Sequence, residues 1–585
     1  MVQTMVDVAA PLNPAEEASE RALAAVFASL ERGESFLLEA GAGAGKTYSL
    51  VKALQFLIKR DQVKLPKRHQ KIACITFTNV AKNEIEARTD RSPLIHCDTI
   101  HAFCWSLISG FQKQLRDRLQ SMDHWPERIV EAGGIGERVV EYTLGYRGIK
   151  DDLVSIHHDD VLLLTIGLME NVKFRRIITD KYPVILIDEY QDTNAGWINS
   201  IKAHFLGQPG SPQFGFFGDH WQKIYGDGCG KIEHPCLNLI GKGANFRSVS
   251  TIVDCLNRMR PELPQFVVDP HEAGSVQVFH TNNWLGTRQT GNHWGGDLPG
   301  EVSHAALTLV MDRLIQEGWD LSSAKAKILM LTHRVLASEQ GYSSLPSIFR
   351  FNEAFTKKEH GHIAFFVDNL EPACDAFIAR QYGKMFTALG GNLPAIINQD
   401  DKAKWSAAME RLINLRTNGT VGDVIAHLRE ARRPRLPDSL EQRERELEHF
   451  DRTADEDMPP ALSEMEALHA VPYQEIVALT RYHDGHSPFE TKHGVKGAEF
   501  DNVIVIVGRG WNRYNFNEML ELAQDVGRIP ANKEETFDRN RNLFYVACSR
   551  PKRRLAILFT QKLSDRAMQT VHTWFGADAV EALAI

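Results

Sequence analysis

The sequence has 585 residues, of which 43% are hydrophobic and 24% charged, the composition of a folded protein with several domains. No apolar run approaches the ~20 residues of a membrane-spanning helix. The first residues also lack the features of a signal peptide, so we expect a cytoplasmic protein with no membrane partner. The net charge of −8 excludes a uniformly basic nucleic-acid binder. It allows a local basic groove, because charges are screened beyond ~10 Å.

A glycine-rich turn stands between an expected strand at 35–39 and an expected helix at 48–54. Its sequence is AGAGAGKT at 40–47. Glycines let backbone N–H groups surround phosphate oxygens, and a helix N-terminus adds partial positive charge. Lys46 can reach the β- and γ-phosphates, and Thr47 can hold Mg²⁺. The turn therefore predicts a nucleotide phosphate site, although Ala40 replaces the first glycine of the usual pattern.

Short apolar segments predict the parallel strands of two α/β cores. Each is followed by turn or cap residues, as in doubly wound sheets. The first group lies at 71–77, 184–188 and 214–219, and the second at 328–332, 503–507 and 555–559. Helix-rich stretches at about 105–181 and 349–472 interrupt the first and the second core.

The expected strand at 184–188 ends in Asp188, and Glu189 follows it, in the segment LIDEYQD at 186–192. The carboxyl edge of such a strand, beside a phosphate loop, is where ligands bind. Asp188 can complete a Mg²⁺ shell, and Glu189 can polarise the attacking water. Paired with the glycine loop, this segment predicts nucleotide hydrolysis.

The eight cysteines form no C-x-x-C pair, so we expect no zinc ribbon. Histidines and cysteines also gather near 96–104 and 229–236, but their spacings match no ligand pattern. Free thiols in a reducing compartment are the simpler interpretation.

Further segments follow in a fixed order, and with the two above they resemble a known family. They are TFTN at 76–79, DTIHAF at 98–103, GDHWQKIYG at 218–226, NFRS at 245–248, TKHGVKGAEF at 491–500 and LFYVACSR at 543–550. In this order they are similar to motifs Ia, Ib, III, IV, V and VI of superfamily 1 helicases of the UvrD/Rep/PcrA type. The resemblance covers most of the chain. It implies an α/β fold of two RecA-like P-loop domains, each interrupted by a mainly helical insertion.

The resemblance also implies domain boundaries. The first RecA-like core would comprise 1–104 and 181–235, with a helical insertion at 105–180. The second would comprise 236–348 and 473–585, with a shortened helical insertion at 349–472. Both insertions look shorter than in the long repair helicases, and we expect no appended nuclease domain.

The resemblance places an ATP site between the cores. Gly41, Ala42, Gly43, Ala44, Gly45, Lys46 and Thr47 would hold the phosphates, Thr47 and Asp188 the Mg²⁺ ion, Phe246 the adenine and Glu499 the ribose. Hydrolysis would use Lys46, Glu189, Gln222, Arg247 and Arg550. Gln222 would sense the γ-phosphate, and the two arginines would come from the second core, where such a group is worth about 10³–10⁵ in rate. Ion pairs, a buried amide, a core phenylalanine and a solvated glutamate are the structural alternatives.

The resemblance also places a DNA-binding surface on several motifs. Its candidate residues are Phe77, Thr78, Asn79, His101, Trp221, Tyr225, Thr491 and His493. Aromatic rings suit base stacking, and hydroxyl and amide groups suit phosphate contacts. Helix capping by Thr78 or Asn79, core packing of Trp221 and Tyr225, and a structural role for His101 are the alternatives.

Three further positions depart from the family pattern. Glu16 stands where the family has a glutamine that reads adenine, and a glutamate can accept from the adenine amino group but cannot donate to N7. Adenine selectivity is therefore open. Asp227 and Gly228 replace a Trp-Arg pair, which removes a stacking platform and a basic contact.

The resemblance implies a helicase that binds single-stranded or tailed double-stranded DNA and hydrolyses ATP with Mg²⁺. Translocation from 3′ to 5′ follows from the resemblance alone. One alternative is a DNA-regulated ATPase switch in a larger complex, for example with a nuclease partner in phage defence, which the short insertions and altered motif III favour. A scaffold that needs no nucleotide is a further alternative.

Overall fold

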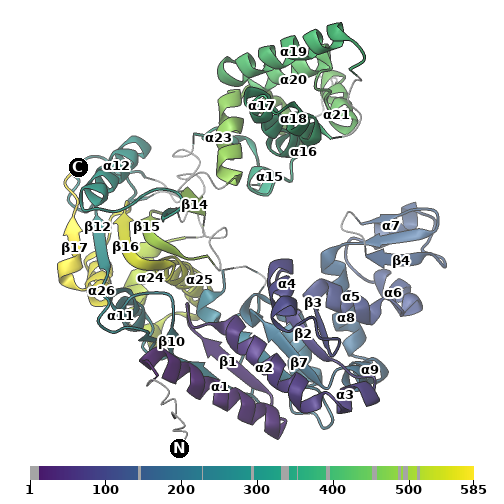
Figure 1. Ribbon diagram of the computed structural model, residues 1–585, viewed down its shortest axis with the longest axis vertical. Coiled ribbons are helices and arrows are strands. Elements are labelled where there is room, and N and C mark those ends of the chain that lie inside the picture. The colour runs from purple at the N-terminus through teal and green to yellow at the C-terminus, as the bar shows by residue number, and fades with distance from the viewer. Residues whose placement is uncertain are drawn as a thin grey trace, which may run out of the picture. The chain divides into compact units, whose positions relative to one another are not determined.

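The structure is a computed structural model (Figure 1). It describes residues 12–142, 147–224, 226, 228–290, 295–330, 341–351, 353–390, 396–450, 458–484, 489–491, 498–509 and 514–585. The chain divides into two compact units, which are described one by one. Unit 1 comprises Met1–Val276, Glu518–Arg554 and Arg566–Ala579, and unit 2 comprises Gln277–Asn517, Leu555–Asp565 and Val580–Ile585.

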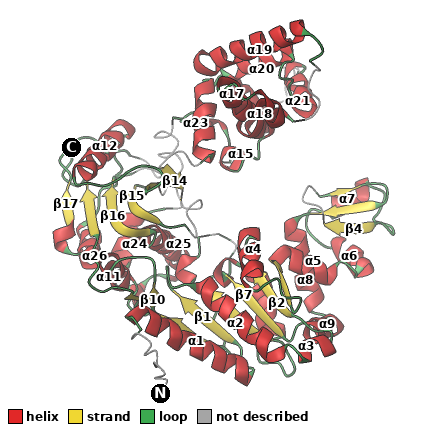
Figure 2. Cartoon of the chain, in the orientation of Figure 1, coloured by secondary structure: helices red, strands yellow, loops and turns green. Residues whose placement is uncertain are grey.

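Unit 1 is built on a six-stranded sheet in the order β3-β2-β7-β8-β1-β9, with parallel pairing throughout. Figure 2 labels β1, β2 and β7 among its strands. Its strands are β1 (Phe36–Ala40), β2 (Ile72–Thr76), β3 (Ile95–Thr99), β7 (Val184–Asp188), β8 (Gln213–Gly218) and β9 (Asn238–Lys242). Every residue of β1, β2, β7 and β8 is buried, as in a sheet covered on both faces. The strands expected at 35–39, 71–77, 184–188 and 214–219 are thus confirmed within a residue or two.

Helices cover both faces of this sheet because its side chains alternate. Phe36 and Leu38 of β1 join one apolar cluster with helices on their side, whereas Leu37 joins the cluster on the other face. The helices of unit 1 near the sheet are α1 (Pro14–Arg32), α2 (Lys46–Asp61), α3 (Lys64–Lys67), α4 (Asn79–Arg88), α5 (Ile100–Ile108), α8 (His158–Met169), α9 (Val172–Lys181) and α10 (Ala195–His204).

The segment at 105–180 is mostly helical, as expected, but it also contains a small sheet. Besides parts of α5, α8 and α9 it holds α6 (Gln112–Leu119) and α7 (Pro126–Glu131). Strands β4 (Val139–Tyr142), β5 (Gly148–Ile149) and β6 (Leu153–Ile156) form a three-stranded sheet in the order β4-β6-β5. The sequence pattern predicts only helices in this segment, so the short strands are an addition that the structure makes.

Three segments that the sequence assigns to the second core belong to unit 1. Besides β9 they carry β10 (Ala244–Asn245), α11 (Ser250–Met259), β11 (Phe266–Val267), most of α24 (Phe516–Leu522), α25 (Ala531–Cys548) and nearly all of α26 (Asp565–Phe575). Side chains of these segments donate hydrogen bonds to the glycine loop and to the turn after β8. These bonds are the physical reason why the segments belong to unit 1. The domain boundaries drawn from the resemblance stay a prediction.

Unit 2 is built on a second six-stranded sheet in the order β14-β13-β15-β16-β12-β17. Its strands are β12 (Ser275–His280), β13 (Ala326–Met330), β14 (Phe489–Thr491), β15 (Phe500–Val507), β16 (Pro551–Phe559) and β17 (Val580–Ala582). Helices α12 (Gly300–Gln316), α24 (Phe516–Leu522) and α26 (Asp565–Phe575) follow these strands along the chain, but most of α24 and nearly all of α26 lie in unit 1. The expected strands near 328–332, 503–507 and 555–559 are confirmed.

The helix-rich stretch expected at 349–472 is present in unit 2, with its own apolar cluster. Its helices, with those directly flanking it, are α14 (Leu345–Ile348), α15 (Glu353–Thr356), α16 (Gly361–Phe365), α17 (Glu371–Ile378), α18 (Tyr382–Leu389), α19 (Gln399–Asn418), α20 (Val421–Ala431), α21 (Asp438–Glu448), α22 (Pro460–His469) and α23 (Tyr473–His483).

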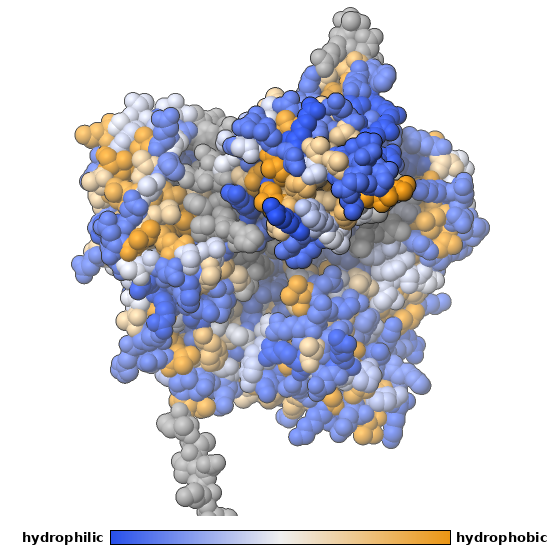
Figure 3. All heavy atoms as spheres, turned by 45° about the horizontal axis from the view of Figure 1, so that its top comes forward, coloured by the Kyte–Doolittle hydropathy of each residue, from blue (hydrophilic) through white to orange (hydrophobic). Residues whose placement is uncertain are grey.

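On the face drawn in Figure 3, apolar residues form scattered patches among hydrophilic ones. Within the described ranges, no helix has both the length and the apolar character needed to cross a bilayer.

Candidate nucleotide-hydrolysis site

The glycine loop connects the carboxyl end of β1 to the start of α2. Gly43 and Gly45 have backbone φ angles of 74° and 72°, which residues other than glycine rarely adopt. Gly45 is the N-cap residue of α2, and no side chain caps this helix. The first N–H groups of α2 are therefore left to an anion, which the helix dipole also favours.

The loop is also tightly enclosed by the NFRS segment and by Gln265. Asn245 and Gln265 donate their side-chain amides to the Ala42 carbonyl at 3.1 and 2.9 Å, and the Phe246 N–H donates to the Gly43 carbonyl at 2.9 Å. A Cβ atom on Gly43 would lie 2.8 Å from the Arg247 Cβ and from the Asn245 Oδ1. Glycine is therefore needed here for close approach as well as for backbone geometry.

Lys46 and Glu189 face one another across the loop. Their Nζ and Oε2 atoms are 3.3 Å apart, and both side chains are partly buried. Glu189 follows β7 directly and has the left-handed backbone angles φ 49° and ψ 47°. A non-glycine residue held there costs about 1–3 kcal/mol, which is typical of functional positions. The carboxylate thus occupies the side of Lys46 where phosphate charge is expected.

Gln191 positions this carboxylate and joins it to the turn after β8. Its amide nitrogen donates to Glu189 and, at 2.9 Å, to Asp192. Its amide oxygen accepts from the Asp219 N–H at 3.0 Å. Gln222 in turn donates to Asp219 Oδ2 at 2.7 Å, so its amide is held by this turn. A change at Gln222 can therefore reach Glu189 through two hydrogen-bonded residues.

Arg247 and Arg550 lie close together in unit 1. Arg247 donates to the Ser549 carbonyl at 3.0 Å, and Arg550, which is 1% exposed, donates from Nε to the Val546 carbonyl at 3.0 Å. Burial chiefly lowers the pKa of Arg550, to about 9, and the nearby Arg247 charge lowers it further, whereas Glu189 acts in the opposite sense. The structure thus brings Lys46, Glu189, Arg247 and Arg550 into one region with an excess of positive charge.

The remaining ATP-side candidates are less closely connected. Thr47 lies in the first turn of α2, and Asp188 is the buried last residue of β7. Their hydroxyl and carboxylate oxygens are the donors that Mg²⁺ prefers, so the donor chemistry fits. The Phe246 side chain is 45% exposed beside the loop. Glu499 lies in unit 2, just before β15, and is exposed.

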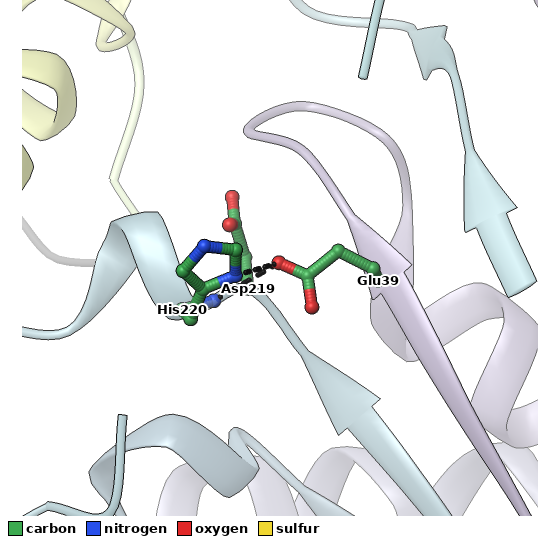
Figure 4. Close-up of side chains that lie close together, drawn as sticks. All are labelled: Glu39, Asp219 and His220. Atoms are coloured by element: carbon green, nitrogen blue, oxygen red, sulfur yellow. Dashed lines mark hydrogen bonds and ion pairs between the residues drawn. The ribbon is translucent and has the colours of Figure 1, made fainter. Parts of the chain in front are cut away.

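A buried charge cluster lies behind the loop, formed by Glu39, Asp219, His220 and Arg260. Figure 4 shows the first three of these side chains together. Arg260 donates to Glu39 at 2.8 Å and to Asp219 at 2.6 Å, His220 Nδ1 lies 2.6 Å from Glu39, and the Tyr190 hydroxyl donates to Glu39 at 2.5 Å. Burial alone would raise the pKa of Glu39, but His220, Tyr190 and Arg260 bring it down to about 2. Although Glu39, Asp219 and His220 are close enough to bind a metal ion, Arg260 already supplies the cation.

We expect Arg260→Ala to destabilise unit 1 by about 3–5 kcal/mol, because Glu39 and Asp219 would stay buried without their cation. Denaturant unfolding followed by tryptophan fluorescence measures this loss. Arg528→Ala is the matched control, since that side chain is 87% exposed in the same unit. Equal stability of the two variants would contradict the assignment of Arg260 as the counter-ion.

The DNA-side candidates other than Trp221 fall into three groups. Phe77, Thr78 and Asn79 are exposed beyond the carboxyl end of β2, and Thr78 also caps α4 by accepting from the Ala81 N–H at 3.2 Å. His101 is partly buried, with its ring 5.1 Å from that of His158, and burial lowers its pKa. Tyr225, His493 and the side chain of Thr491 lie outside the described residues.

Trp221 lies in the interior, so the core-packing alternative is the one that the structure favours. Its ring is buried, 5.3 Å from that of Tyr545, and the Arg541 guanidinium lies 4.0 Å from its centre. Asn542 of the same helix donates to the His220 carbonyl at 2.9 Å. The expectation that Trp221 stacks on a base fails for this conformation, because α25 covers the ring.

Of the positions that depart from the family pattern, Glu16 and Gly228 have local explanations, and Asp227 lies outside the described residues. The Glu16 carboxylate accepts from the Asn13 N–H at 3.1 Å and so completes a capping box at the start of α1. A Cβ atom on Gly228 would lie 2.3 Å from the Gln191 carbonyl oxygen, so a larger residue would displace the segment that holds Glu189.

Comparison with known proteins gives two family matches in chain order. Residues 23–227 match the AAA domain family, and residues 349–562 match the UvrD-like helicase C-terminal domain. The chain belongs to the UvrD-like superfamily 1 helicases. The two parallel sheets of this UvrD-like chain are therefore RecA-like P-loop domains with helical insertions, as the resemblance implied.

Three relatives match different shares of this UvrD-like chain. Gabija protein GajB of Bacillus cereus is 24% identical over 95% of the chain and 97% of its own length. ATP-dependent DNA helicase Rep of Buchnera aphidicola is 27% identical over 38% of the chain and 40% of Rep. ATP-dependent DNA helicase PcrA of Staphylococcus aureus is 24% identical over 38% of the chain and 37% of PcrA.

Several residues of the site escape sequence reasoning. Gln191 could have been found from the sequence, since it lies inside the acidic segment after β7. Arg260, Gln265 and Lys242 could not, because each stands alone in the sequence and is brought to the loop by tertiary packing.

Proposed function

We propose that this UvrD-like chain hydrolyses Mg-ATP when bound to single-stranded DNA, moves from 3′ to 5′ and separates strands. The observation that carries the proposal is the meeting of Lys46, Glu189 and Arg550 beside a glycine loop. An ammonium group, a carboxylate and a guanidinium group are the parts that phosphoryl transfer to water requires.

The loop residues would bind and orient the triphosphate. N–H groups of Gly45 and of the first turn of α2 would contact the phosphate oxygens, and Lys46 would leave Glu189 to bind the β- and γ-phosphates. Glu189, released but still held by Gln191, would take the proton of the attacking water. Thr47 and Asp188 would hold Mg²⁺, which neutralises charge on the phosphates.

The two arginines would stabilise charge that develops on the γ-phosphate. Repulsion between their guanidinium groups, together with the burial of Arg550, is a cost that an incoming phosphate anion relieves. Arg247 is tied to the Ser549 carbonyl, so the two side chains would respond to the ligand as a unit. Binding of the triphosphate would in this way draw NFRS and α25 toward the loop.

Exposed groups of unit 1 would contact the DNA. Phe77, Thr78 and Asn79 offer a ring, a hydroxyl and an amide on the surface. They directly follow β2, which lies beside β7 in the sheet. Such groups suit base stacking and phosphate contacts on a single strand.

The test is strand displacement from duplexes that carry a single-stranded tail at either the 3′ or the 5′ end. We expect ATP-dependent displacement with the 3′ tail and none with the 5′ tail. Lys46→Ala should abolish displacement from the 3′-tailed duplex. Displacement from the 5′-tailed duplex alone would contradict the proposed direction.

A second candidate function is a DNA-regulated ATPase subunit of a larger complex, for example with a nuclease partner in phage defence. The observation that favours it is the match to GajB over 95% of the chain, whereas Rep and PcrA match 38%. DNA-stimulated ATP hydrolysis without displacement from either duplex would favour this role over the motor.

A further inference from the structure

Lys242 places a buried ammonium group directly against the glycine loop. It is the last residue of β9, and its relative exposure is 0%. Nζ donates to the Gly45 carbonyl at 3.2 Å and to the Ser49 hydroxyl at 2.8 Å. It also lies 3.7 Å from where a Cβ atom on Gly45 would be. The group therefore contacts both ends of the first turn of α2.

This position is costly for a lysine. An ammonium group has three N–H donors, and within the described ranges only these two uncharged oxygens accept from it. Burial lowers the pKa of Lys242 to about 8. A positive charge beside a helix N-terminus is also unfavourable, because the helix dipole already places positive potential there. An apolar side chain of the same length would be the stable choice for the protein alone.

Among the residues that the structure describes, no carboxylate bonds to or forms an ion pair with Lys242. In β1, Ala40 is its register partner, while Glu39 points to the opposite face of the sheet and belongs to the Arg260 cluster. From α2 comes the Tyr48 ring, whose centre lies 5.8 Å from the Lys242 ammonium group and 5.4 Å from that of Lys52. From α1, which also packs against β9, Ser29 bonds to Asn238 at the opposite end of the strand from Lys242. Burial is the cause of the pKa shift.

We propose that Lys242 is a positioning residue of the nucleotide site, which fixes the Gly45–Ser49 turn and adds a second ammonium charge behind the phosphate loop. This inference rests on the proposed function and adds to it a linkage between protonation and polyphosphate affinity. A bound phosphate chain supplies a negatively charged partner for the Lys242 ammonium group. Binding therefore favours the protonated lysine, and the affinity falls as the pH rises through about 8.

Calorimetric titration with Mg-ADP between pH 6.5 and 9.5 tests the proposal without any substitution. At pH 8, we expect the wild-type protein to take up a fraction of a proton on binding, seen as a dependence of the heat on the ionisation enthalpy of the buffer. Affinity should be highest below pH 8 and fall above it. Binding without proton uptake, at an affinity that stays constant to pH 9.5, would overturn the proposal.

Two variants separate the charge from mere packing. Lys242→Met should bind Mg-ADP about tenfold more weakly at pH 7, with no decline above pH 8, while its melting temperature without ligand is equal to or above that of the wild type. Lys242→Arg should keep the affinity at pH 7 and lose the decline, since arginine stays protonated. A Met variant that loses melting temperature but keeps wild-type affinity would assign Lys242 a structural role and overturn the proposal.

The same titration distinguishes this inference from the function on which it rests. If wild-type protein binds Mg-ADP and Lys46→Ala does not, the phosphate site stands, whatever Lys242 does. If the wild type itself binds no Mg-ADP, the proposed function fails first.

Discussion

Replacing Arg550 by alanine is expected to lower the turnover number for ATP by about 10³–10⁵. The guanidinium group is buried beside Arg247 and Glu189, so solvent cannot replace it in stabilising the charge on the γ-phosphate. Because its contribution arises as charge develops on the γ-phosphate, turnover should fall far more than the affinity for Mg-ADP. A coupled assay of ATP hydrolysis, combined with calorimetry, measures the two effects separately.

Arg528→Ala serves as the control for this variant, since it removes an exposed arginine from the same unit. Its turnover should equal that of the wild type. Because Arg550 also donates to the Val546 carbonyl, the melting temperature of the alanine variant must be measured too. A folded Arg550→Ala protein whose turnover lies within threefold of the wild type would remove Arg550 from the reaction.

Glu189→Gln is the second variant with a large expected effect, a loss of about 10²–10⁴ in ATP turnover. Glutamine keeps the size and the contact with Gln191, but it cannot take a proton from water. The ion pair with Lys46 is lost as well, so Lys46 is freed for the phosphates. We therefore expect Mg-ADP and single-stranded DNA to bind at least as tightly as to the wild type.

Glu535→Gln is the matched control, because its side chain is 95% exposed in the same unit. Single-turnover hydrolysis measures the chemical step apart from product release. Wild-type turnover in Glu189→Gln would show that another group takes the proton. Weak Mg-ADP binding would instead mean that Glu189 holds the loop in place.

The parts that the sequence predicts well are those with a local physical cause. Four of the strands in the first sheet are apolar on both faces, and the glycine loop needs positive φ angles that few other residues adopt. Asp188 ends a strand and Glu189 follows it, at a point that the pattern identifies directly. For the same reason, the expected strands of the second sheet agree with the structure.

The parts that the sequence leaves open depend on contacts between distant segments. Trp221 looks like a stacking ring until α25 is seen to cover it. Arg260 looks like a surface residue until Glu39 and Asp219 converge on it. Lys242 would be expected to point to solvent, yet the sheet turns it under the loop. In each case a polar or aromatic group is buried by residues more than 30 positions away.

The central claim is that the glycine loop, Lys46, Glu189 and Arg550 form one site that hydrolyses ATP under the control of DNA. The most direct measurement is the steady-state rate of ATP hydrolysis with and without single-stranded DNA, for the wild type and for Lys46→Ala. We predict strong stimulation of the wild type by DNA and no hydrolysis by the variant under either condition. Hydrolysis by Lys46→Ala at the wild-type rate would contradict the account, as would a folded wild-type protein that hydrolyses no ATP in the presence of DNA.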